Sequence, residues 1–122
     1  MLPFSIVTRP GRSLHDQIVF AVTKAVITGQ MQPGDSFPSV RALSQELGIN
    51  PNTSAKAIAT LIERGLLEPH PGIGTTVARW RRRPASDGRA AVNEQIDRLV
   101  VDAKHLGLDL DDLVSALRKA WK

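Results

Sequence analysis

The sequence predicts a mainly α-helical protein that carries one small β-hairpin. Apolar residues recur at helical spacing in several segments, most of which begin at a capping residue and end at a glycine. One stretch, LLEPHPGIGTTVARW, instead places two short extended runs around the turn sequence Pro71-Gly72-Ile73-Gly74. With 122 residues, the chain has room for one small domain and an appendage.

The first predicted helix follows an N-terminal arm, Met1 to Gly11. Ser13 is a good N-cap, and Asp16 can answer it in a capping box. Gly29 is expected to end the helix, because glycine suits the left-handed conformation there. One apolar stripe is formed by Leu14, Ile18, Ala21, Val22, Ala25 and Val26.

Two more helices follow a segment, MQPGDSFPS, that is expected to form a turn. Ser39 can cap a helix from Val40 to Leu47. Asn50 can cap the next one, with Pro51 at its first position, where a missing N–H costs nothing. The buried face of that third helix is expected to hold Ala57, Ile58, Leu61 and Ile62.

The predicted hairpin completes a domain over residues 1–80. Gly72 and Gly74 suit its tight turn. Pro69 lies in the first extended run, and proline cannot donate to a β-ladder, so that strand is expected at the edge of the sheet.

Beyond the hairpin, residues 81–89 have the composition of a basic linker, and residues 90–122 are expected to form a two-helix tail. Steps of four and three along the first tail helix give an apolar seam of coiled-coil type. Gly107 ends that helix, and Asp109 begins the next. A seam of this kind is uncovered in a monomer, and pairing two copies about a two-fold axis would bury it. The expected dimer interface holds Val92, Ile96, Leu99, Ala103, Leu106, Leu113 and Leu117.

The charge of the chain is concentrated at its front. Residues 1–83 hold ten Lys and Arg against five Asp and Glu, whereas residues 84–122 hold six against seven. A basic module suits a polyanionic partner. The chain contains no cysteine, which excludes disulfide bonds and thiolate metal sites.

Several other classes of protein are not expected. No signal-peptide pattern and no membrane-spanning apolar run occur, so the sequence indicates a cytoplasmic protein without a membrane partner. The three histidines lie on different predicted elements, without metal-ligand spacing, and no cofactor is expected. Nucleophile motifs and paired catalytic carboxylates are missing, so an enzyme is not expected.

Three helices followed by a hairpin are the order of a winged helix-turn-helix, with Gly48-Ile49-Asn50 as the tight turn. In that motif the N-terminal end of the later helix enters the DNA major groove, where short side chains with donors and acceptors reach base edges. Asn52, Thr53 and Ser54 meet this demand. Lys56 can reach a phosphate or a guanine edge. The backbone amides of Asn52 and Thr53 also suit a phosphate.

Short motifs occur in order along this region: Pro33-Gly34-Asp35, Pro38-Ser39-Val40-Arg41, Asn50-Pro51-Asn52-Thr53, Lys56-Ala57 and Gly72-x-Gly74-Thr75. With them, the stretch from Leu14 to Arg79 resembles the winged-helix domain of GntR-family transcription regulators. The Asn50 motif and the short tail resemble the YtrA-like subfamily. The resemblance implies a homodimer that binds a near-palindromic operator. We therefore expect a sequence-specific DNA-binding regulator that acts as a repressor, because a dimer on promoter DNA would exclude polymerase.

The resemblance also implies roles for particular residues. Ser39 and Arg41 would contact DNA at the start of the second helix, and Thr53, Ser54 and Lys56 would do so from the recognition helix. Gly72 and Gly74 would shape a wing tip for the minor groove, with His70 where relatives often carry a basic residue. The chain departs from the family pattern at three positions. Valine is common at Ser54, tyrosine at Ile58 and phenylalanine at Thr76.

Alternatives remain at this point. Winged-helix folds also serve as protein-interaction adaptors that do not bind DNA. The basic run from Arg79 to Arg83 is either a solvated linker or a source of phosphate contacts. A small-molecule effector is compatible with the sequence but not indicated, because two short helices cannot enclose a pocket of ~300 Å³.

Overall fold

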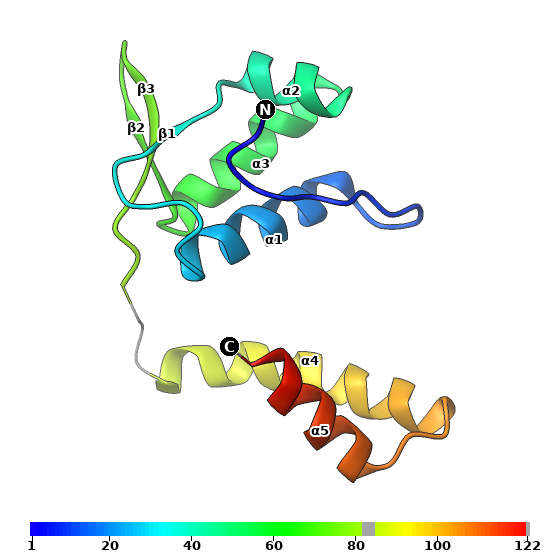
Figure 1. Cartoon of the computed structure of the whole chain (residues 1–122). Coiled ribbons are helices and arrows are strands. Elements are labelled where there is room, and N and C mark those ends of the chain that lie inside the picture. Colours follow the sequence, from blue (N-terminus) through cyan, green and yellow to red (C-terminus); the bar gives the residue numbers. More distant parts are fainter. Residues whose placement is uncertain (82–84, 122) are drawn as a thin grey trace. The chain divides into compact units, whose positions relative to one another are not determined.

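In the computed structural model, residues 1–81 and 85–121 are described, and they form five helices and one three-stranded antiparallel sheet (Figure 1). The predicted fold class, mainly α with a small β wing, is therefore confirmed. The chain divides into two compact units, of which the first ends at Arg81. The first unit holds the elements from α1 to β3, and the second holds α4 and α5.

The three helices of the first unit begin at the predicted caps. The Ser13 hydroxyl accepts a hydrogen bond from the Asp16 amide at 3.3 Å, and the Ser39 hydroxyl accepts one from the Ala42 amide at 3.1 Å. The Asp16 carboxylate contacts Nδ1 of His15 at 2.9 Å. In the predicted capping box it would instead accept a hydrogen bond from the backbone amide of Ser13. The helices are α1 (Leu14–Ile27), α2 (Val40–Leu47) and α3 (Pro51–Glu63).

The core of this unit lies where α1 and α2 pack against α3. Every residue of the predicted α1 stripe is buried except Leu14, which is partly exposed. On α3 the predicted face is buried as well, with Ile62 at its margin. The largest side chains buried there are Ile18, Met31, Leu43 and Leu61.

The N-terminal arm belongs to this core, which the sequence did not predict. Phe4 is buried and stacks on Phe37, with ring centroids 5.9 Å apart and planes 4° apart. Leu2 and Ile6 pack beside it. The apolar residues of the arm contact a distant strand and do not recur at helical or strand spacing. The sequence pattern therefore could not predict that they are buried.

The sheet has the order β1-β3-β2 and holds β1 (Ser36–Phe37), β2 (Leu67–His70) and β3 (Gly74–Val77). The predicted hairpin is β2–β3, and Pro69 does lie on an edge strand. The sequence missed β1, a two-residue strand within the segment expected as a turn. It pairs with β3 in the register Ser36 to Thr76.

The second unit consists of two helices, α4 (Ala85–His105) and α5 (Leu110–Ala120), joined by a short turn (Figure 1). The turn closes as predicted at Gly107, whose φ is 80°, and the Leu108 amide donates to the Ala103 carbonyl at 2.8 Å. Asp109 and Asp112 form a reciprocal capping box.

The boundary between linker and tail differs from the prediction. Because α4 begins at Ala85, residues 85–89 are helical rather than part of a linker over 81–89. Arg82 and Arg83 of the predicted basic run lie outside the described residues. None of the helices in the described ranges is long and apolar enough to cross a membrane.

Candidate nucleic-acid interface

The candidate interface is built on α2 and α3, which are joined by the predicted tight turn. Gly48 takes a left-handed conformation, with φ of 63°, and allows the chain to reverse between the two helices. Ile49 is half-buried below the turn and packs against the core. This arrangement brings the start of the recognition helix, α3, close to the end of α2.

Two backbone amides at the start of α3 are held by its own cap. The Asn52 amide donates to Oδ1 of Asn50 at 2.8 Å, and the Thr53 amide donates to the Asn50 carbonyl at 3.0 Å. Asn50 thus already accepts from both amides, so a phosphate at the predicted place would have to compete with the cap. The cap leaves the side chains, rather than the backbone, to reach a partner.

Most of the predicted contact residues of α2 and α3 present exposed side chains. Ser39, Arg41, Asn52 and Lys56 are exposed, and Thr53 is half-buried. Within residues 1–81 and 85–121, neither Arg41 nor Lys56 pairs with a carboxylate. Both cations are thus available to an anionic partner. The hydroxyl of Ser39 also caps α2, so any DNA contact by Ser39 would share that group with the cap.

Ser54 is a correction to the predicted interface. Its side chain is 0% exposed, and its hydroxyl lies 2.9 Å from the hydroxyl of Ser44 on α2. Ser44 gives its one proton to the Val40 carbonyl at 2.6 Å, so Ser54 donates to Ser44. Ser54 therefore joins the two helices and cannot contact DNA. Sequence reasoning gave no role to Ser44, which follows the buried Leu43 on α2.

We expect Ser54→Ala to lower the free energy of unfolding by about 1 kcal/mol, because a buried hydrogen bond between α2 and α3 is lost. Affinity for operator DNA should stay within about twofold of the parent. Urea denaturation and DNA titration measure the two quantities separately, with Ser5→Ala, at an exposed position, as the matched control. A large loss of affinity at unchanged stability would restore Ser54 to the contact set.

The wing tip is a turn that depends on glycine. The Ile73 amide donates to the His70 carbonyl at 2.9 Å, with Pro71 and Gly72 between them. Gly72 has φ of 77°, as the third position of a type II turn requires. Gly74 has φ of 138° and begins β3, so a side chain at either glycine would strain the tip. The predicted structural role of both residues is thus confirmed.

His70 is tied across the wing. Its Nε2 lies 2.9 Å from the hydroxyl of Thr76, which faces it from β3. Thr76 stands where the family pattern has an aromatic residue, and this bond links the two strands in its place. Because the bond uses Nε2, a DNA contact by His70 would have to come from Nδ1.

The predicted dimer seam is largely uncovered in the second unit. Val92, Ile96, Leu99, Leu106 and Leu117 are exposed, and Leu113 is half-buried. Ala103 is a correction, because it is only 3% exposed. It lies beside the turn, where it lines a hollow of about 210 Å³ with Leu108 and Leu113, and so it packs within its own chain.

Two further kinds of site concern the described residues: metal sites and the basic run after β3. Residues 1–81 and 85–121 contain no group of three or more His, Asp or Glu side chains that could hold a metal ion. Arg79 and Arg81 of the basic run are exposed after β3, so they are accessible to solvent or to an anion.

Residues 14–77 match the family described as bacterial regulatory proteins, gntR family. The HTH-type transcriptional repressor YtrA of Bacillus subtilis (strain 168) is 32% identical over 106 residues, which cover 86% of this chain and 82% of YtrA. A transcriptional antiterminator from Listeria monocytogenes EGD-e has the same fold, with a TM-score of 0.83 at 23% identity over 98% of this chain and 90% of that chain.

A similarity to a complex with nucleic acid is also found. AraR(DBD) in complex with operator ORX1 superposes with a TM-score of 0.52 at 26% identity, over 61% of this chain and 95% of that chain.

Proposed function

This chain belongs to the gntR family of bacterial regulatory proteins, and we propose that it acts as a homodimeric repressor on a near-palindromic operator. Membership of the family makes it a DNA-binding transcription regulator and not an enzyme. The proposal concerns the finer points: which residues contact DNA, how two copies pair, and the sign of regulation.

The proposed DNA contacts lie at the N-terminal ends of α2 and α3. Asn52 and Thr53 offer base edges a short amide and a hydroxyl, and Lys56 offers a cation. Arg41, the second residue of α2, suits a phosphate or a guanine because its guanidinium is exposed and lacks a carboxylate partner among the described residues. The wing tip around Gly72 and Gly74 would follow the minor groove, with His70 beside it.

The observation that carries the dimer is the exposed apolar seam on α4. Ile96 is 48% exposed, and its neighbours along the seam, Val92 and Leu99, are similarly open to solvent. Apolar side chains in register on one helix gain most by burial against an identical helix. The spacing of four and three residues suits packing of the coiled-coil kind.

A two-fold dimer would set the spacing of the operator. Two recognition helices that enter successive major grooves on one face of DNA lie about 34 Å apart, which is one helical turn. The operator would then be near-palindromic, with half-sites roughly 10 base pairs apart. Repression would follow from a dimer that covers promoter DNA and excludes polymerase. The Bacillus subtilis relative is named a repressor, which supports repression rather than activation.

A salt-dependent titration of the full chain tests the proposal. Fluorescence anisotropy would compare DNA from upstream of the chain's own gene with a scrambled duplex, between about 50 and 200 mM salt. We expect tighter binding to the promoter, a footprint with two-fold symmetry, and an affinity that falls with salt by a slope of about −0.9 per neutralised phosphate. Equal affinity for both duplexes would contradict an operator at this promoter. An asymmetric footprint would contradict the dimer.

A further inference from the structure

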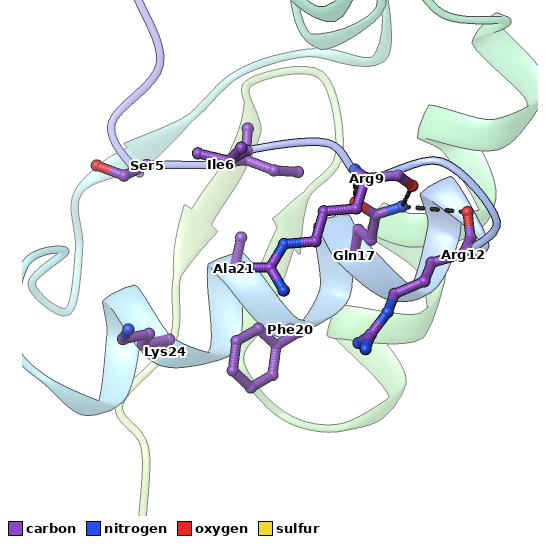
Figure 2. A pocket seen from close by; sticks show the side chains of 9 residues that line it. Ser5, Ile6, Arg9, Arg12, Gln17, Phe20, Ala21 and Lys24 are labelled. Atoms are coloured by element: carbon purple, nitrogen blue, oxygen red, sulfur yellow. Dashed lines mark hydrogen bonds between the residues drawn. The ribbon is translucent and has the colours of Figure 1, made fainter. Parts of the chain in front are cut away.

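The N-terminal arm and α1 line an open hollow of about 440 Å³ in the first unit (Figure 2). Ile6 and Ala21 contribute apolar side chains to its mixed lining. Its rim carries Arg9 and Arg12 from the arm, and Phe20 and Lys24 from α1. None of its lining residues belongs to the predicted set of DNA contacts.

Gln17 holds the arm over this hollow by three hydrogen bonds. Its side-chain oxygen accepts from the Arg9 amide at 2.7 Å, and its side-chain nitrogen donates to the carbonyls of Arg9 and Arg12, both at 3.1 Å (Figure 2). All three bonds reach the backbone of the arm. The backbone that carries the two arginines is therefore fixed to α1, and within residues 1–81 and 85–121 their guanidinium groups form no ion pair with a carboxylate.

The Arg9 side chain extends from the arm across the part of α1 that carries Ala21 and Phe20, the Arg12 side chain extends beside it, and Lys24 lies farther along α1 (Figure 2). Within the described residues 1–81 and 85–121, neither arginine pairs with a carboxylate. The nearest acid on α1, Asp16, contacts His15 at 2.9 Å. Two cations on a fastened loop thus share a hollow without an internal counter-ion, which suits an anion.

Phe20 adds a flat apolar surface to this charge. Its side chain is 69% exposed, although it lies in the middle of a helix whose other face is fully buried. A large exposed aromatic ring is costly in water and is well suited to stack on a planar ligand. A guanidinium group binds a carboxylate or phosphate through paired N–H donors, and an aromatic side chain stacks on a flat ring. Side by side, the two can bind both parts of one ligand.

We propose that this hollow binds a small organic anion in which a phosphate or carboxylate is attached to a flat ring. Arg9 and Arg12 hold the acid group, and the ring of the ligand stacks on Phe20. A volume of about 440 Å³ accommodates a molecule of nucleotide size. The inference does not depend on which residues contact DNA.

Isothermal titration calorimetry of the full chain with three probes tests the site. Adenosine monophosphate carries an acid group and a flat ring, inorganic phosphate carries only the acid, and adenosine carries only the ring. We expect the monophosphate to bind at least about 5-fold more tightly than either partial probe, because stacking and the charge contact then act together. Equal affinity for the monophosphate and inorganic phosphate would overturn the role of Phe20.

Two substitutions with matched controls test the residues. Phe20→Ala should weaken binding of adenosine monophosphate by about 5-fold or more, and the double variant Arg9→Gln/Arg12→Gln should abolish it. Ile27→Ala, at another exposed apolar position of α1, and Arg118→Gln, at an exposed arginine of α5, should leave binding unchanged. These side chains are exposed, so circular dichroism and melting temperature should match the parent. Unchanged binding in the double variant would overturn the site.

The anion could instead be the phosphate of DNA, and the same variants distinguish this source. In that case the double variant would lose affinity for promoter and scrambled DNA alike, with a shallower salt slope, and adenosine monophosphate would not bind. That result would replace the small-molecule site with a DNA contact and would overturn the proposal.

Discussion

Arg41→Ala should lower the affinity of this protein for its operator by roughly 5- to 150-fold, equivalent to about 1–3 kcal/mol. The side chain is exposed near the start of α2, and within the described residues it has no carboxylate partner. Its loss would therefore remove the proposed contact with DNA without leaving a buried charge unpaired. The free energy of unfolding should change by less than about 0.5 kcal/mol.

The pattern of the loss identifies what Arg41 contacts. A phosphate contact would lower affinity for operator and scrambled DNA alike and reduce the salt slope by about 1. A guanine contact would lower only operator affinity and would relax specificity at one base pair. Anisotropy titrations at several salt concentrations separate the two cases.

Arg64→Ala is the matched control for this experiment. Arg64 is exposed and caps the C-terminal end of the recognition helix, roughly 20 Å along the axis from its N-terminal end. It should leave operator affinity nearly unchanged. If Arg41→Ala behaved like Arg64→Ala, the start of α2 would have no part in the interface.

Ile96→Asp should raise the dissociation constant of the dimer by more than about 100-fold. The substitution removes an apolar side chain from the seam and introduces a carboxylate that pairing would have to desolvate, twice in a symmetric interface. Sedimentation velocity should show a monomer at micromolar concentration. Operator affinity should fall with it, because a monomer contacts only one half-site.

Val101→Asp provides the control for charge and helix propensity. Val101 is exposed on α4, but at about 100° per residue it lies on the side of the helix away from Ile96 and Leu99. It should leave the dimer intact. A stable dimer in Ile96→Asp would mean that the two copies pair through another surface.

The helix boundaries of this protein could be predicted because their signals are local. Ser39, Asn50 and Asp109 each cap a helix at the position predicted, and glycines end the helices where expected. A cap contacts an amide only two or three residues away, so the sequence pattern contains both partners. The start of α4 at Ala85 was missed, since that helix begins in a small-residue segment whose composition resembles a linker.

The candidate site was predicted less completely. Ser54 was placed among the contacts because short polar residues at the start of a recognition helix suit base edges, yet it is buried against Ser44. The direction of a side chain near the helix start depends on how α2 crosses α3. One residue of helix is about 100° of rotation, so a local pattern cannot decide which polar neighbour faces the core.

The sequence by itself determined the mainly helical class, the caps, the wing turn and the residue types offered to DNA, because each depends on neighbours a few positions apart. Only the tertiary structure decided that Phe4 stacks on Phe37, that His70 is tied to Thr76, and that Gln17 holds the arm over α1. These contacts join segments that meet only after the helices have packed. They depend on distances and burial in space, which periodicity along the chain does not contain.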